Sequence, residues 1–265
     1  MAYAPPQVVE AQPRQALPFG IFSALSLRES SDSHWANGVE WEAMTCDPVS
    51  GINDPDCDTD IEFMFADSGL LGEASGFAVY GSYNCGPIGR PLPKAEEMAT
   101  AQLLAREEAQ VEAQVWGRLA AAAHDVNPGG ALDPVEALAA LEDWLGGVYG
   151  SLGTIHGSRG AATILSKFVM PSGSRLLTKI GTPVIAGGGY PGTSPAGAPA
   201  AAGETWVLAS PALFGYRGQV FNSSSRKGDL LDRGTNDLYA IAARNYVVGF
   251  DPCGVAAVRL NKTCC

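Results

Sequence analysis

The clearest periodic pattern along the chain is helical and lies between Pro93 and Ala123. A proline at the start suits the first turn of a helix, Glu96 and Glu97 favour its positive end, and alanines fill the rest. Large apolar residues recur on one side with helical spacing, in a stripe about 80° wide. We therefore predict a long helix over residues 93–123. Its apolar face is expected to carry Leu104, Val111, Val115 and Leu119.

A second, shorter helix is predicted to begin after Asp133. An aspartate can cap the free amides, Pro134 fits the first turn, and Glu136 completes a capping box. Gly146 and Gly147 weaken the end of the segment. The apolar face of this helix is expected to carry Val135, Leu138, Leu141 and Leu145.

Runs rich in aromatic and β-branched residues predict strands before and after the helices. Residues 38–48 and 76–85 are bounded by Gly, Pro and Asn, and we expect them to form the two arms of one long hairpin. The tip of this hairpin would be the acidic stretch Gly51–Asp60. A loop rich in Gly, Pro and Ala, Gly187–Gly203, divides the later part. The later strand-like pieces are Gly153–His156, Thr182–Ala186, Trp206–Ala209 and Tyr246–Phe250.

Composition agrees with an α+β protein rich in loops. Of 265 residues, 46% are apolar and 17% charged, which is typical of a folded chain, and the 32 glycines and 18 prolines indicate many turns. No run of 18 apolar residues occurs, so we expect no transmembrane helix. The N-terminal residues lack the pattern of a secretory signal, and synthesis in a cytoplasm is expected.

The charges are separated along the sequence. Between Arg28 and Arg90 there are 12 acidic residues and no Lys or Arg, while the other 16 acidic residues are matched by 17 basic ones. From Trp144 to Gly203 there is no acidic residue. This separation favours steering of one surface onto another, although a solvated acidic face is an alternative. The net charge of −11 disfavours sequence-independent binding of nucleic acid. The basic residues of the acid-free segment are Arg159, Lys167, Arg175 and Lys179.

Four alternating aspartates near the predicted hairpin tip are candidate oxygen ligands. In an extended backbone they would share one face. An EF-hand is excluded, because Thr59 stands where glycine is needed and Phe65 where glutamate is needed. A solvated loop tip and an irregular calcium or inter-subunit cation site both stay open. The acidic residues of this stretch are Asp54, Asp56, Asp58, Asp60 and Glu62.

Two further motifs imitate catalytic or cofactor sites. Gly187, Gly189 and Gly192 match the dinucleotide-binding pattern, but Pro191 and the residues after it cannot begin the helix that would hold a pyrophosphate, so we interpret the segment as a loop. His156 lies in an apolar strand-like run, where a histidine is expected to be packed or hydrogen-bonded. We predict no catalytic residue, cofactor site or metal site.

The six cysteines form no C-x-x-C pair, which disfavours a structural zinc site. Free, partly buried thiols are the favoured interpretation, and disulfides that form after release from a reducing cytosol are the alternative. The spacing leaves the pairing open. The cysteines are Cys46, Cys57, Cys85, Cys253, Cys264 and Cys265.

The order of arm, hairpin, long helix and α+β portion resembles the Hong Kong 97-type major capsid proteins of tailed bacteriophages, most closely those of actinobacterial phages. The resemblance covers about residues 17–258. It is carried by the phrases LPFGIFSALSLRESSDSHWANGVEWEAMTCDPVSG, LLAREEAQVEAQVWG, ALAALEDWLGGVYGSLGTIHGSRG, LLTKIGTPVIAGGGYPG and GDLLDRGTNDLYAIAARNYVVGFDPCGVAAV.

The resemblance implies an N-terminal arm (1–37), an extended loop (38–90), and a spine helix with peripheral and axial domains (91–265). It also implies a structural, non-enzymatic subunit that assembles into pentamers and hexamers of an icosahedral head around double-stranded DNA. Portal, scaffold and decoration proteins would be its partners, and the virion its location after assembly in the host cytoplasm. The alternatives are an encapsulin-type compartment shell and a small secreted hydrolase.

One family feature is missing. Some members cross-link through a lysine of the extended loop, but this chain has no lysine between residues 29 and 89. We therefore expect non-covalent contacts, disulfides or a cement protein to hold the shell. Our hypothesis is that the acidic loop lies across the basic 144–203 surface of an adjacent subunit.

Overall fold

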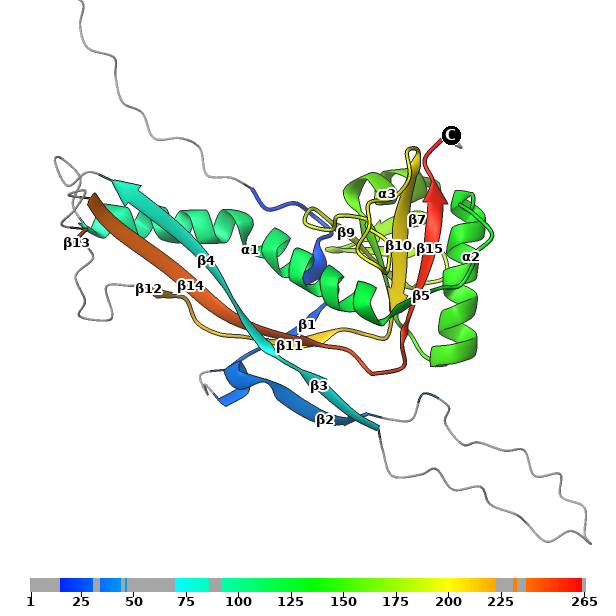
Figure 1. Cartoon of the computed structure of the whole chain (residues 1–265), viewed down its shortest axis with the longest axis horizontal. Helices are drawn as coiled ribbons and strands as arrows, with labels where there is room; N and C mark the ends of the chain where they lie inside the picture. The colour runs from blue at the N-terminus through cyan, green and yellow to red at the C-terminus, as the bar shows by residue number, and fades with distance from the viewer. Residues whose placement is uncertain are drawn as a thin grey trace, which may run out of the picture.

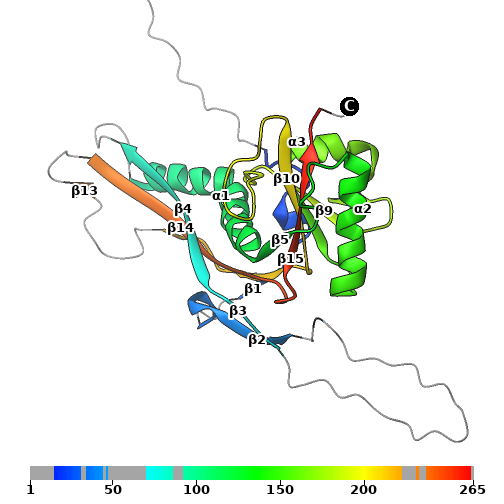
Figure 2. The ribbon, with the colours of Figure 1, turned by 45° about the vertical axis from the view of Figure 1, so that its right-hand side comes forward.

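The computed structural model of the chain describes residues 15–30, 34–43, 46, 70–85, 92–222, 231–232 and 237–263. These residues form an elongated lobe, built on one long helix and two long strands, and a second lobe around an upright sheet (Figure 1). A small hairpin lies below the junction of the two lobes, and a view turned by 45° preserves this arrangement (Figure 2).

The long helix α1, Leu92–Ala122, confirms the helix predicted over residues 93–123. Val111, Val115 and Leu119 are buried as predicted. Leu104 was wrongly assigned to the same face, because it is 56% exposed whereas Leu103 is 1% exposed. A step of one residue turns a helix by about 100°, so Leu103 falls on the buried face and Leu104 beside it.

The sheet of the elongated lobe is built around β14, Asp237–Gly249, which pairs antiparallel with β4, Gly76–Cys85, over ten residues. The face of this ladder that carries Val79 and Ala240 is buried against α1. A methyl group added at Gly81 would lie 2.6 Å from the carbonyl oxygen of Ala99, so glycine permits the close approach of strand and helix. The smaller strands are β1, Ser26–Glu29; β11, Phe214–Arg217; β12, Phe221–Asn222; and β13, Leu231–Asp232.

The predicted pairing of residues 38–48 with 76–85 is wrong. Strand β2, Val39–Ala43, pairs instead with β3, Leu70–Ala74, and β4 belongs to the sheet of β14. The sequence Leu-Leu-Gly-Glu-Ala of β3 has no β-branched or aromatic residue, so its composition does not mark a strand. The predicted tip, Gly51–Asp60, lies outside the described residues.

The second lobe contains a seven-stranded sheet in the order β5-β15-β10-β6-β9-β8-β7. Three predicted strand pieces fall in β6, β9 and β10, whereas Tyr246–Phe250 belongs to the end of β14 in the other sheet. The strands are β5, Ala123–Asp125; β6, Thr154–Ser158; β7, Val169–Ser172; β8, Arg175–Thr178; β9, Pro183–Gly187; β10, Glu204–Ser210; and β15, Val255–Asn261.

Helix α2, Pro134–Trp144, follows Asp133 as predicted, but the Asp133 side chain makes no capping hydrogen bond. Leu138, Leu141 and Leu145 are buried, whereas Val135 is exposed and does not belong to the apolar face. A π-helix, η3 (Leu145–Tyr149), follows α2 directly. The remaining helical segments are η1, Ile21–Ser23; η2, His34–Asn37; α3, Arg159–Ile164; and η4, Leu165–Lys167.

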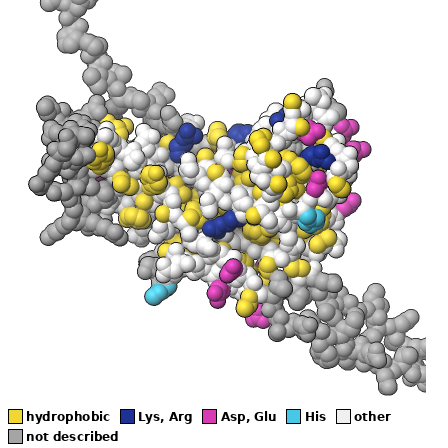
Figure 3. Space-filling view, in the orientation of Figure 1, with side chains coloured by type: hydrophobic (Ala, Val, Ile, Leu, Met, Phe, Trp, Pro, Cys, Tyr) yellow, Lys and Arg dark blue, Asp and Glu magenta, His cyan; other side chains and the backbone are white. Residues whose placement is uncertain are grey.

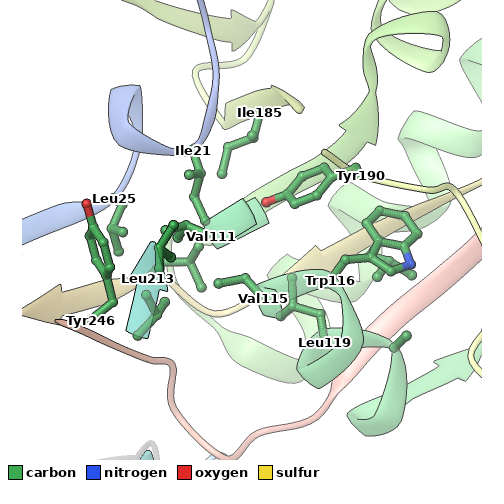
Figure 4. Close-up of a cluster of buried hydrophobic side chains, with 14 of the residues drawn as sticks. Ile21, Leu25, Val111, Val115, Trp116, Leu119, Ile185, Tyr190, Leu213 and Tyr246 are labelled. Carbon is green, nitrogen blue, oxygen red and sulfur yellow. The ribbon is translucent and has the colours of Figure 1, made fainter. Parts of the chain in front are cut away.

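Two buried clusters lie on opposite faces of the upright sheet. Along β10, Trp206 and Leu208 belong to the cluster beneath α1, and Val207 and Ala209 to the cluster beneath α2, as the two-residue period of a strand requires. Figure 4 shows the first cluster, in which Ile21 and Val111 meet at the middle of α1. None of the helices in the described ranges combines the length and apolar character of a membrane crossing.

Candidate assembly surfaces and the arm junction

The β2–β3 hairpin forms a two-stranded sheet of its own, outside the two larger sheets. Its inner face is fixed to the body by Trp41, whose ring meets Phe214 edge-on at 4.7 Å between centroids. The indole Nε1 of Trp41 donates to Asp251 Oδ1 at 3.3 Å, and the Tyr149 hydroxyl donates to Asp251 Oδ2 at 3.3 Å. The direction of the hairpin is therefore set by contacts of its inner face with the body of the molecule.

A disulfide between Cys46 and Cys253 adds a covalent tie at the same place. Their Cα atoms lie 5.1 Å apart, although 207 residues separate them in sequence. The interpretation of the cysteines as free thiols is thus wrong for this pair, because the fold brings the turn between β14 and β15 to the end of β2. The side chain of Cys85 and residues Cys57, Cys264 and Cys265 lie outside the description.

The solvent face of the hairpin is acidic around one exposed leucine. Glu40 stands directly opposite Glu73, and Glu42 opposite Leu71, which is 75% exposed. Like charges at directly opposed positions repel, so the isolated hairpin gains nothing from this arrangement. Figure 3 shows acidic side chains beside an apolar one along the lower edge, where the hairpin lies in Figure 1. A basic surface of another molecule would reduce the repulsion between Glu40 and Glu73, and an apolar surface would bury Leu71.

The basic residues proposed for subunit contact occupy different environments. Lys167, Arg175 and Lys179 are exposed at or beside the β7–β8 hairpin. Arg159 is instead occupied within its own chain, where its Nη1 donates to the Pro18 carbonyl at 2.9 Å. The acidic residues of the hypothesis, Asp54, Asp56, Asp58, Asp60 and Glu62, lie outside the described residues.

A junction in the middle of α1 holds the beginning of the described chain. The carboxylate of Glu112 accepts from the Ile21 amide at 3.0 Å and from the Gly189 amide at 2.6 Å. Glu108 accepts from the Phe22 amide at 3.0 Å. Burial raises the pKa of Glu112 to about 7, against the opposing effect of the amide hydrogen bonds, and burial also raises the pKa of Glu108. One helix thus holds the arm and the glycine-rich loop together through two carboxylates.

A third glutamate of α1 connects the helix to the sheet of the elongated lobe. Glu107 accepts a hydrogen bond from Arg244 Nη1 at 2.7 Å and another from the Tyr246 hydroxyl. Burial, and then the Glu107 carboxylate, raise the pKa of Tyr246. Sequence reasoning missed this role and the two at the junction. The sequence did contain an indication of these roles. Glu108 and Glu112 are four residues apart on a helix, where like charges repel each other, so such a pair suggests that other groups contact the two carboxylates.

His156 belongs to a buried polar network. The Ser210 hydroxyl donates to the Pro211 carbonyl at 2.7 Å, so it accepts from His156 Nε2 at 2.8 Å, and the Tyr190 hydroxyl donates to His156 Nδ1 at 3.0 Å. Burial lowers the pKa of His156 to about 3. The histidine is packed and hydrogen-bonded, as predicted, and a substrate has no access to its pair with Ser210.

The glycine-rich segment after β9 and the possible metal ligands were the remaining candidate sites. The loop after β9 does not begin a helix, which confirms the interpretation of Gly187–Gly203 as a loop. No group of at least three His, Cys, Asp or Glu side chains in the described ranges is arranged to hold a metal ion.

No protein-family model and no curated protein matches the sequence. Solved structures do match. The SrpI encapsulin of Synechococcus elongatus is 12% identical with a TM-score of 0.55, over 97% of this chain and 94% of that one. The capsid of an empty GTA particle is 12% identical with a TM-score of 0.55, over 97% and 95%. A structure from Mycobacterium phage Che8 is 12% identical with a TM-score of 0.53, over 99% and 98%. The chain therefore has the Hong Kong 97-type fold.

Proposed function

We propose that this chain is the major capsid protein of a tailed bacteriophage. Its copies would assemble into pentamers and hexamers of an icosahedral head that encloses double-stranded DNA. The observation that carries the proposal is the fold likeness to shell proteins over nearly the whole chain. The acidic outer face of the hairpin supports it, because no Lys or Arg of the described residues forms an ion pair with that face.

The proposed parts of the subunit follow the resemblance. Residues 1–37 would be the arm, α1 the spine helix, the sheet of β14 the peripheral domain and the seven-stranded sheet the axial domain. The loop Gly187–Gly203 would lie near the centre of a capsomer. Because β4 pairs with β14, the extended loop that the resemblance places at residues 38–90 would end at about Ser75.

The acidic loop would lie across the basic surface of a neighbouring subunit. Lys167, Arg175 and Lys179 are the cations available for it, since Arg159 is used within its own chain. Each exposed pair contributes about 0–1 kcal/mol, but the contact repeats at every subunit. In a closed shell one subunit leaves only when all its contacts break, so weak contacts suffice.

Neither a lysine of the extended loop nor the described disulfide would supply a covalent bond between subunits. The extended loop has no lysine for a cross-link, and the disulfide of Cys46 and Cys253 lies within one chain. We infer that non-covalent contacts, disulfides of the other cysteines, or cement and decoration proteins hold the shell. Portal and scaffold proteins would be further partners, the DNA would be packaged without sequence-specific binding, and the protein would reside in the virion after assembly in the host cytoplasm.

An encapsulin-type compartment shell is the second candidate, favoured by the likeness to the SrpI encapsulin. A secreted hydrolase is disfavoured, because the Ser210–His156 pair is buried and its hydroxyl is bonded to a carbonyl. Particles purified from the producing cell decide between the two shells. DNA inside and a portal vertex identify a virus, whereas an enclosed enzyme and no portal identify a compartment.

A further inference from the structure

The junction at the middle of α1 joins three parts of the chain that are distant in sequence. Glu112 is 1% exposed, yet its two oxygens each accept an amide hydrogen bond, one from Ile21 of the arm and one from Gly189 of the loop after β9. Glu108, one turn earlier, accepts from Phe22. Figure 4 shows Ile21 and Tyr190 placed around Val111 of the same helix.

The contacts leave little room for a different arrangement. A methyl group at Gly189 would lie 2.7 Å from the Ala109 carbonyl carbon, so the loop touches the backbone of α1. A methyl group at Gly20 would lie 2.8 Å from Glu108 Oε2. The two carboxylates accept from the amides at the start of η1, which have no partner within that short helix.

The groups facing this site carry an excess of negative charge. On α1, Glu107 lies next to Glu108, although Arg244 and Tyr246 of β14 hydrogen-bond Glu107. Tyr190 of the loop lies near the carboxylates, and its hydroxyl donates a hydrogen bond to Nδ1 of the neutral His156. The positive charge of Arg159 lowers the pKa of Glu108 and so partly offsets the effect of burial. The arm contributes only amides. Hence no basic side chain of the described residues forms a hydrogen bond or an ion pair with Glu112.

We propose that Glu108 and Glu112 form a proton-controlled latch, which holds the arm and the glycine-rich loop on α1 more firmly at mildly acidic pH than at alkaline pH. The direction of this pH dependence follows from the different proton affinities of Glu112 in the closed and the open state. The closed latch binds a proton at Glu112 with a pKa of about 7, whereas an exposed glutamate does so near 4.5. Closure is therefore favoured as the pH falls from above 7 toward 4.5, and the gain is complete below that. This inference concerns the single chain and does not depend on the proposed function.

The test is amide hydrogen exchange of the full chain between pH 6 and pH 8, expressed as protection factors so that the intrinsic rate is removed. For an opening that exposes Glu112, the two pKa values predict that protection of Ile21, Phe22 and Gly189 falls about tenfold from pH 6 to pH 8. Glu112→Gln should remove this dependence, whereas Glu97→Gln, at an exposed position of the same helix, should keep it.

Protection that changes less than about twofold in the wild-type chain would overturn the proposal, as would a tenfold change that persists in Glu112→Gln. If Glu112→Gln does not fold, Glu108→Gln replaces it and should reduce the pH dependence. Amides of β10 and β15 serve as an internal reference. A parallel tenfold change there would mean that the whole lobe opens, and would equally overturn a local latch.

Discussion

Cys46 and Cys253 form a disulfide that joins the end of β2 to the turn between β14 and β15. The bond reinforces the contacts of Trp41 with Phe214 and Asp251 on the inner face of the hairpin. A hairpin that is to meet another subunit in a fixed position would need such an anchored inner face, because its outer face provides no stabilisation within its own chain.

Removal of this disulfide should weaken the fold. Because it closes a very long segment, Cys253→Ser should lower the free energy of unfolding by about 2–4 kcal/mol, measured by urea denaturation without reductant. Reductant should lower the wild-type value by a similar amount and leave the variant unchanged. Equal stability of the wild-type chain with and without reductant would show that the bond does not contribute.

The Glu107–Arg244 ion pair should matter more than the Glu29–Arg217 pair on the same sheet. Glu107 and Arg244 have side chains only 6% and 15% exposed, so Glu107→Ala leaves a buried guanidinium uncompensated. We expect a loss of about 3 kcal/mol in the free energy of unfolding. Glu29 is 74% exposed, and Glu29→Ala is the matched control with little expected effect. Similar losses in both variants would contradict this ranking.

His156 should make the fold sensitive to acid. An unfolded chain protonates this imidazole near pH 6.5, whereas burial keeps it neutral in the folded chain down to about 3. Between these values the unfolded state binds the extra proton, so the contribution of His156 lowers the free energy of unfolding as the pH falls from 6.5 toward 3. His156→Gln should flatten this part of the stability profile, and His124→Gln, at an exposed histidine, should not. A profile unchanged by His156→Gln would disprove the assignment.

Reversal of two exposed cations tests the proposed loop contact. Arg175→Glu combined with Lys179→Glu should reduce the yield of assembled shells. The shells that still form should fall apart at lower salt concentrations, because salt screens the remaining charge pairs between subunits. Arg106→Glu, at an exposed site on α1, is the charge-matched control for the single variant Arg175→Glu, because each reversal changes the net charge by the same amount. Shell yield and salt resistance equal to those of the control would count against the contact.

The long helix was predictable because its pattern is local. A proline start, alanine-rich filling and i, i+4 apolar spacing are all readable from residues 93–123, and only the phase at Leu104 was wrong. The class of fold was predicted from the resemblance to Hong Kong 97-type capsid proteins, and the structural likeness confirms it.

The pairings were not predictable, because they join distant segments. Nothing in the composition of β3 distinguishes it from a loop, and the match of β4 with β14 spans more than 150 residues. Glu112 was missed for a related reason. A glutamate on a helix is usually solvated, and only the return of the arm and of the loop at Gly189 makes this one buried.

Self-assembly is the central claim, and negative-stain electron microscopy of the purified recombinant chain tests it most directly. The account predicts closed, uniform shells, or rings of five and six subunits, that sediment far faster than a single 27.5 kDa chain. A preparation that contains only folded monomers at every concentration and salt condition would contradict it.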